Sequence, residues 1–355
     1  MFINTVNKNN YVSIAKGIAI VLMVIGHAGC PALLHDTIYS FHMPFFFIVS
    51  GMFFVPPTDR GFMKQFIMRR IKGLYIPFIK YGLLFLLLHN FFLHIKLYNP
   101  TIAVMGEYPY FFDLKDFLIH LIYIVLGMEK VDPFIGPFWF LKSLFLASIS
   151  SVIFYNIFKT KLFPYIFLLL SLFVSLIFYY HPLSYYFIGD FRLIPIAVFF
   201  YQSGYLMRKL INDKWFFNKI VQIFLIALFL YLNLKFRNSL SIKCHGSYLF
   251  IFMLTSFSGT AILLNLSKII EGSIVANFFC YLGKRTMLIL TFHLISFKII
   301  SLMVVKLYNL PYSSIGYYPV IPGVDNFWIL YSIIGVMIPV TFPFIWSFCI
   351  TRNNG

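Results

Sequence analysis

The stretch that decides the fold is "YVSIAKGIAIVLMVIGHAG", residues 11–29. It is largely apolar, and one helix of this length can cross the roughly 30 Å of hydrocarbon in a bilayer. Similar apolar runs recur along the 355 residues, which are 61% hydrophobic and only 11% charged, with a mean hydropathy of +0.87. Soluble globular domains do not have this composition. The sequence therefore predicts an all-α, polytopic integral membrane protein.

Apolar runs of the right length predict about ten transmembrane helices. A shorter stretch that begins with charge, residues 114–128, is interpreted as an interfacial or half-inserted helix. The predicted spans lie near residues 11–30, 38–55, 74–95, 137–158, 163–180, 188–207, 216–234, 246–266, 286–305 and 326–350.

The net charge of +17 indicates orientation in the membrane. With ten spans and both termini in the cytoplasm, most of the 28 Lys and Arg residues fall in cytoplasmic segments, as the positive-inside rule requires. Nucleic-acid binding is therefore not expected. The four cysteines are scattered, so we expect no metal site and no obligatory disulfide. Without a Pro-, Gly- or Ser-rich linker or a clear repeat, residues 1–355 are predicted to form a single membrane-embedded domain.

The ionisable residues inside the predicted spans are basic. A charged group at a helix centre costs about 2.5 to 3.5 kcal/mol on insertion scales, so such groups usually face a cavity or a partner. All 11 acidic residues fall in predicted loops or at span ends. This pattern disfavours a proton-coupled pump, which usually needs a carboxylate inside the membrane. A basic cavity is suited to bind an anionic ligand or to stabilise negative charge that develops in a reaction. The basic residues in the spans are Lys16, His27, His42, Lys80, His89, Lys142, Arg192, His293 and Lys298.

Lys16 and His27 are eleven residues apart. On an α-helix this spacing is about 1100° of rotation, within roughly 20° of alignment, and about 16 Å of rise. Both side chains therefore share one helix face. Two interpretations fit this spacing: a catalytic face that runs inward from the cytoplasm, or a snorkelling lysine with a histidine bonded to a neighbouring helix.

Two further segments carry candidate residues. In "FHMPFFFIVSGMFF" (41–54), Pro44 should bend or start a helix. Ser50 and Gly51 are small enough to allow close approach of a neighbouring helix. His42 either contacts a polar substrate or belongs to an aromatic belt at the membrane interface. In "FIMRRIKGLYIPF" (66–78), the predicted loop places three basic residues before the third span. These residues either only orient the chain in the membrane or also bind phosphate groups as a clamp. They are Arg69, Arg70 and Lys72.

Taken together, these segments resemble the membrane acyltransferase type 3 family, the bacterial O-acetyltransferases of surface sugars, and most closely its fucose 4-O-acetylase-like branch. The resemblance extends along nearly the whole chain. Lys16 stands where the family commonly has Arg, and either Arg69 or Arg70 matches the first basic residue of the third-span motif. The similar motifs are "KGIAIVLMVIGH" (16–27), "FHMPFFFIVSG" (41–51), "RRIKGLYIPF" (69–78), "PFWFLKSL" (137–144), "RLIPIAVFFYQSGYL" (192–206) and "YLGKRTMLILTFHLI" (281–295).

The resemblance implies an O-acetyltransferase of a bacterial inner membrane. It would move an acetyl group from cytoplasmic acetyl-CoA to a sugar hydroxyl of a surface polysaccharide, such as O-antigen, capsule or exopolysaccharide, or of a lipid-linked precursor. His27 would be catalytic with Lys16, while Arg69, Arg70 and Lys72 would hold the donor. A transporter or flippase for an anionic or lipid-linked sugar is the alternative. The acceptor side would be lined by His42, Trp139, Lys142, Arg192 and His293.

Overall fold

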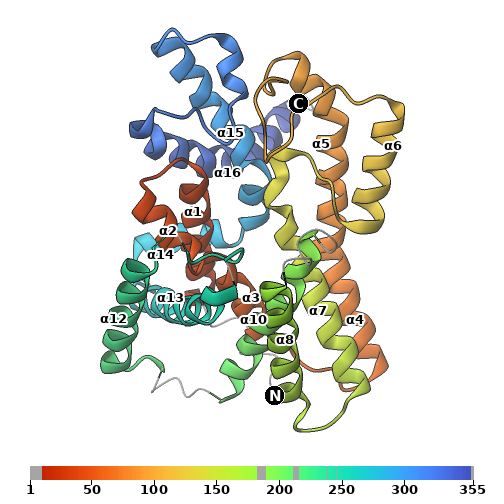
Figure 1. Ribbon diagram of the computed structural model, residues 1–355, viewed down its shortest axis with the longest axis vertical. Coiled ribbons are helices and arrows are strands. Elements are labelled where there is room, and N and C mark those ends of the chain that lie inside the picture. The colour runs from red at the N-terminus through yellow and green to blue at the C-terminus, as the bar shows by residue number, and fades with distance from the viewer. Residues whose placement is uncertain (1–9, 182–188, 211–215, 238, 245, 353–355) are drawn as a thin grey trace. The chain divides into compact units, whose positions relative to one another are not determined.

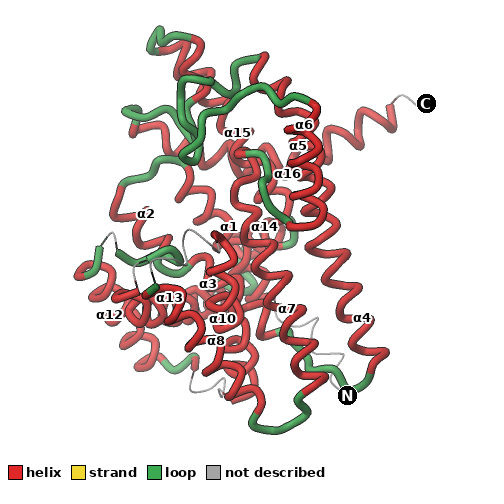
Figure 2. The backbone as a smooth tube through the Cα atoms, turned by 45° about the vertical axis from the view of Figure 1, so that its right-hand side comes forward, coloured by secondary structure: helices red, strands yellow, loops and turns green. Residues whose placement is uncertain are grey.

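The computed structural model describes residues 10–181, 189–210, 216–237, 239–244 and 246–352. Over these ranges the regular structure is helical and no strand is present (Figure 2). The all-helical, multi-pass membrane fold is therefore confirmed, while the number of about ten spans and the cytoplasmic position of both ends stay predictions. The described ranges contain six helical segments long and apolar enough to cross a membrane: Asn10–His27, Arg60–His94, Pro133–Ile157, Phe163–Tyr180, Gly246–Ile269 and Thr286–Leu307.

The chain divides into two compact units. The first comprises Met1–Ala15, Asp36–Pro77 and Trp139–Asn277. The second comprises Lys16–His35, Phe78–Phe138 and Phe278–Gly355. Each unit collects segments that are far apart in the sequence. The expectation of one domain over residues 1–355 stays a prediction.

The first unit is organised around α10, which packs against α3, α7 and α8. Helix α13 packs against both α3 and α12. Aromatic side chains fill the interior, and Phe200, Tyr201 and Phe252 are fully buried. The helices of this unit are α3 (His42–Met52), α4 (Arg60–Arg70), η1 (Ile71–Tyr75), α7 (Trp139–Ile157), α8 (Phe163–Tyr180), η4 (Gly189–Arg192), α10 (Leu193–Leu210), α12 (Lys219–Lys235), η5 (Gly246–Tyr248) and α13 (Leu249–Ile269).

The second unit is organised around α15, which packs along α16 and contacts η3 and η6 (Figure 1). Phe134, Phe297 and Tyr331 are buried in its interior. Four helices have residues in both units: α1 (Asn10–His27), α2 (Ala32–Tyr39), α5 (Ile76–His94), whose residues from Phe78 belong here, and α14 (Ile274–Gly283). The others of this unit are α6 (Leu114–Ile122), η2 (Tyr123–Gly127), η3 (Pro133–Phe138), α15 (Thr286–Leu307), η6 (Tyr312–Gly316), η7 (Asp325–Phe327) and α16 (Trp328–Arg352).

The prediction of one continuous span over 38–55 is wrong. Helix α2 ends at Tyr39, and α3 begins at His42 and has 11 residues. An α-helix of that length rises about 16 Å, roughly half the hydrocarbon thickness. Pro44 lies in the first turn of α3, where proline is tolerated because its missing N–H has no intrahelical partner to lose. Most of α3 is buried, so its apolar sequence reflects a position inside the protein.

The basic segment before the third span is helical and does not form the predicted loop. Helical structure runs from Arg60 to His94 through α4, η1 and α5 (Figure 1). Asp59 caps the start by accepting a hydrogen bond of 2.8 Å from the backbone N–H of Phe62. Pro77 removes one donor from the helix, and the preceding turn, η1, has π-helical geometry. Single π-turns of this kind are frequent at functional sites.

Helices α3 and α10 approach each other closely through two glycines. A Cβ atom on Gly51 would lie 1.8 Å from the backbone oxygen of Tyr201, and one on Gly204 would lie 1.9 Å from the backbone oxygen of Ile48. Small residues let helix backbones approach in this way in membrane proteins. The predicted close approach at Gly51 is therefore confirmed.

We expect Gly51→Ala to lower the stability of the protein by about 1 to 3 kcal/mol, the usual cost of overpacking. The added methyl group would meet backbone atoms of α10, which cannot move aside as a flexible side chain can. The measurement is the thermal unfolding midpoint in detergent. Gly127→Ala is the matched control, because a Cβ there has no neighbour closer than 3.8 Å. An unfolding midpoint for Gly51→Ala equal to that of Gly127→Ala would contradict this packing.

Candidate active site

Lys16 and His27 lie on one uninterrupted α-helix, α1, and both belong to the second unit. Each side chain is half-buried. The helix ends at His27 because Gly29 takes a left-handed conformation, with φ at 74°, that favours glycine. His27 is thus the last residue of α1. The negative end of the helix dipole favours a positive charge at that position.

His293 lies on α15 and is fully buried. Its Nδ1 lies 3.0 Å from the backbone oxygen of Ile289 and 3.1 Å from that of Leu290. Because carbonyl oxygens only accept hydrogen bonds, Nδ1 carries the proton and Nε2 presents a lone pair. Among the described residues, that buried Nε2 has no hydrogen-bond partner.

The two imidazoles of the second unit are neighbours. The ring centroids of His27 and His293 are 5.4 Å apart, with a tilt of 40° between the ring planes. These residues are 266 positions apart in the sequence, and no spacing rule connects them. Sequence reasoning assigned His293 to the acceptor side without placing it beside His27. This pair is the candidate catalytic centre.

The three basic residues before α5 do not share one environment. Arg70 donates a hydrogen bond of 3.2 Å to the hydroxyl of Tyr201, and its guanidinium lies 5.0 Å from the centroid of the Phe66 ring. Arg69 and Lys72 are exposed. They are three residues apart, which is about one helical turn. Arg70 is therefore anchored to α10, whereas Arg69 and Lys72 offer accessible charge.

The predicted acceptor-side residues other than His293 belong to the first unit. His42 is buried, and its Nδ1 lies 2.8 Å from the backbone oxygen of Ile38. Lys142 is also buried, with its Nζ 3.5 Å from the centroid of the Phe191 ring. Phe191 precedes Arg192, so the structure brings Lys142 to the segment that carries Arg192. Trp139, at the start of α7, is half-buried.

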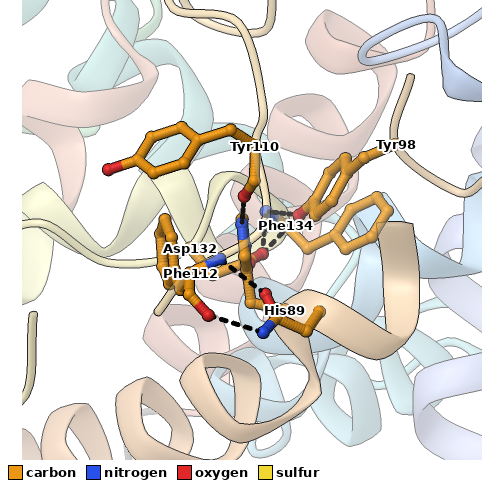
Figure 3. A network of polar contacts seen from close by, with 7 residues as sticks. His89, Tyr98, Tyr110, Phe112, Asp132 and Phe134 are labelled. Atoms are coloured by element: carbon orange, nitrogen blue, oxygen red, sulfur yellow. Dashed lines mark hydrogen bonds and ion pairs between the residues drawn. The ribbon is translucent and has the colours of Figure 1, made fainter. Parts of the chain in front are cut away.

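A second polar cluster in the second unit was not foreseen (Figure 3). Asp132 is buried, and its Oδ2 lies 2.9 Å from Nδ1 of His89. Its Oδ1 accepts hydrogen bonds from the hydroxyl of Tyr98 and from the backbone N–H of Phe134, the latter at 3.0 Å. The other ring nitrogen of His89 lies 3.1 Å from the backbone oxygen of Tyr110. Both ring nitrogens of His89 thus face acceptors.

This cluster ties the connection between α5 and α6 to α5. The ring of Phe112 stacks on that of His89 with centroids 3.9 Å apart. Asn90 bonds both backbone groups of Phe112, at 2.8 and 2.9 Å. Burial, together with the nearby Asp132 carboxylate, raises the pKa of the Tyr98 hydroxyl well above its usual range, so Tyr98 keeps the proton that it donates. His89 and Asp132 are 43 residues apart, and no sequence spacing relates them.

No group of three or more His, Cys, Asp or Glu side chains in the described ranges is placed to hold a metal ion. The absence of a metal site stays a prediction.

Comparison with known proteins identifies one family. The model of that family, Acyl_transf_3, described as "Acyltransferase domain", matches residues 9–346. The chain belongs to the acyltransferase type 3 family. Comparisons with curated proteins and with solved structures find no match. This acyltransferase is thus a multi-pass membrane enzyme whose family match includes the histidine pair, the basic segment and the predicted acceptor residues.

Proposed function

We propose that this acyltransferase moves an acetyl group from cytoplasmic acetyl-CoA to a sugar hydroxyl of a surface polysaccharide or of its lipid-linked precursor. The acceptor would be O-antigen, capsule or exopolysaccharide, and the location would be a bacterial inner membrane. The observation that carries the proposal is the His27–His293 pair in a chain whose family match spans residues 9–346. Placement in the fucose 4-O-acetylase-like branch is part of this proposal.

His27 is the proposed general base. A histidine has a reference pKa of about 6.5, which suits removal of a hydroxyl proton near neutral pH. The sugar oxygen attacks the thioester carbonyl carbon while its proton passes to His27. The carbon–sulfur bond then breaks, and the coenzyme A thiolate leaves and takes the proton from the His27 imidazolium, which restores the neutral base. The end of α1 favours the imidazolium that forms at His27 during attack. Lys16 lies on the same helix, and we propose that its positive charge helps to bind the acetyl-CoA donor.

Arg69 and Lys72 are the proposed clamp for the phosphates of acetyl-CoA. Both are exposed, and they lie on neighbouring turns of one helical segment. Arg and Lys bind phosphate through charge-assisted hydrogen bonds. Arg70 supports the clamp by holding this segment to Tyr201 of α10. In this proposal Arg69 and Lys72 bind the phosphates, and Arg70 anchors their helical segment to α10.

We expect Arg69→Ala and Lys72→Ala each to raise KM for acetyl-CoA about tenfold or more, because each removes a charge-assisted hydrogen bond to the donor. Arg70→Ala is the matched comparison. It should lower the unfolding midpoint through loss of the Tyr201 bond and change KM less than the other two substitutions do. The measurement is initial-rate kinetics on purified protein, with thermal unfolding in parallel. Unchanged KM in both Arg69→Ala and Lys72→Ala would rule out this clamp.

The acceptor is proposed to meet four of the predicted acceptor-side residues. Trp139 is half-buried and offers an aromatic face on which a sugar ring could stack. Lys142 and Arg192 lie on segments that meet at Phe191 and supply positive charge there. His42 completes the proposed set. His293 is grouped with His27 instead, because its ring contacts that of His27.

The rival function is a transporter or flippase for an anionic or lipid-linked sugar, which could use the same basic residues. Deletion of the gene separates the two functions when surface glycans are analysed by mass spectrometry. Loss of O-acetyl groups with normal polymer length supports the acyltransferase. Loss of the polymer itself supports transport and would overturn the proposal.

A further inference from the structure

We propose that His293 is a positioning residue that accepts a hydrogen bond from His27 when His27 takes the proton of the acceptor hydroxyl. This inference rests on the proposed function, because it assigns a partner to the same catalytic histidine. It changes the expected role of His293 from contact with the acceptor to support of the base.

The backbone of α15 fixes the tautomer of His293. Its Nδ1–H donates to the backbone oxygens of Ile289 and Leu290, within its own helix. A neutral imidazole that donates from Nδ1 can only accept at Nε2. The backbone of α15 thus holds the ring with its lone pair directed away from Ile289.

The lone pair on Nε2 is buried and accepts no hydrogen bond from the described residues. His293 has an exposed fraction of 0%, and its Nε2 has no hydrogen-bond partner among the described residues. Most buried polar atoms in native proteins have a partner, and an exception calls for an explanation. A lone pair directed at a donor that strengthens when it becomes charged during the reaction is such an explanation.

Two aromatic rings lie next to His293, and one of them can donate a hydrogen bond. The described ring contacts of His293 are with His27 and with Phe297, and only His27 carries N–H groups on its ring. A centroid separation of 5.4 Å lets rotation of the His27 side chain bring a ring nitrogen toward Nε2 without movement of either helix. Of these two rings, His27 is therefore the one that can donate to Nε2 of His293.

The hydrogen bond strengthens as the proton of the hydroxyl moves. A neutral His27 that accepts this proton on one ring nitrogen carries its N–H on the other nitrogen. That N–H can donate to Nε2 of His293, and it becomes a stronger donor when the His27 ring is an imidazolium. A hydrogen bond that strengthens as charge develops lowers the barrier, because it stabilises the transition state more than the ground state. Proton transfer stops at His27, and His293 keeps its own proton on Nδ1.

The test uses two amide substitutions that place an acceptor at different positions. His293→Gln puts its side-chain carbonyl near the position of Nε2, whereas the shorter side chain of His293→Asn ends near Nδ1. We expect His293→Asn to lower kcat about ten- to a hundredfold, the usual value of a hydrogen bond to a charged group, with KM for acetyl-CoA unchanged. His293→Gln should recover much of this loss. The assay uses the purified full chain in nanodiscs, acetyl-CoA and the source cell's surface polysaccharide after removal of its O-acyl groups with mild base.

A double substitution tests whether His293 acts through His27. His27→Ala and His27→Ala/His293→Asn should have the same residual rate, because a partner of His27 has no effect once His27 is absent. Ser296→Ala is the control on the same helix. Ser296 is buried and its hydroxyl donates to the backbone oxygen of Phe292, so its loss should leave kcat unchanged.

Three outcomes would overturn the inference. The first is a wild-type kcat in His293→Asn, and the second is an equal loss in the Asn and Gln variants with a matching fall in thermal stability. The third is a further rate loss in the double variant relative to His27→Ala. Failure of the proposed function looks different, because then His27→Ala itself would retain full transfer. An inactive His27→Ala with a fully active His293→Asn would contradict only the role of His293.

Discussion

Replacement of His27 by alanine is expected to lower kcat for acetyl transfer by about 10² to 10⁴, the usual contribution of a general base. His27 is the last residue of α1 and lies beside a buried imidazole whose Nε2 has no hydrogen-bond partner within the described ranges. Without His27, the attacking hydroxyl would lose its proton to solvent alone. The measurement is the initial rate of acetyl transfer by purified protein at saturating acetyl-CoA.

The matched control is His94→Ala. His94 is also the last residue of a membrane-spanning helix, α5, but it is exposed. Its replacement should leave kcat unchanged, because no catalytic role is assigned to it. Equal protein yield and equal unfolding midpoints in the two variants show that the comparison reports chemistry. A His27→Ala enzyme with wild-type kcat would remove His27 from the mechanism.

Replacement of Asp132 by alanine is expected to destabilise the protein by about 3 to 5 kcal/mol, as is typical when one partner of a buried ion pair is removed. The carboxylate accepts from the Tyr98 hydroxyl and from the Phe134 backbone, and it pairs with the His89 ring (Figure 3). All these donors would be left buried without the acceptor that they share. The unfolding midpoint in detergent and the yield of folded protein measure the effect.

Asp132→Asn separates charge from hydrogen bonding at this position. The amide keeps an acceptor oxygen for Tyr98 and Phe134 but loses the charge that faces His89, so its midpoint should lie between those of the wild type and Asp132→Ala. The control is Arg237→Ala, which breaks an ion pair at 3.6 Å between the exposed Arg237 and the half-buried Asp36. Water screens a pair with an exposed arginine, so it should contribute about 1 kcal/mol or less. If Asp132→Ala proved no less stable than Arg237→Ala, the cluster would not hold this part of the unit together.

Much of the helical fold could be predicted because bilayer thickness sets the length of an apolar run. The helices Phe163–Tyr180 and Thr286–Leu307 lie where apolar runs predicted them. The same rule failed over 38–55. A short buried helix inside a membrane protein has the same apolar composition as a lipid-facing span, and composition does not record the break between Tyr39 and His42. The basic residues Arg69, Arg70 and Lys72 were assigned to a loop before the third span because their charge interrupts the apolar run, whereas the helix continues through them into α5.

The candidate site was predictable where its residues share one helix. Helical periodicity alone places Lys16 and His27 on one face. Contacts between distant helices were not predictable in this way. The approach of His293 to His27, and that of Asp132 to His89, depend on packing between segments that no sequence spacing relates. The different roles of Arg70 and its neighbours, Arg69 and Lys72, likewise could not be predicted, because they depend on the contact of Arg70 with Tyr201.

This acyltransferase is proposed to move an acetyl group from acetyl-CoA to a sugar hydroxyl, with His27 as the base. The most direct test incubates the purified chain in nanodiscs with acetyl-CoA labelled in the acetyl group and de-O-acylated surface polysaccharide. Mass spectrometry then follows the label. We predict that the wild type places labelled O-acetyl on the polysaccharide and that His27→Ala does not. Polysaccharide that stays unlabelled with the folded wild-type protein, or that is labelled equally by His27→Ala, would contradict the claim.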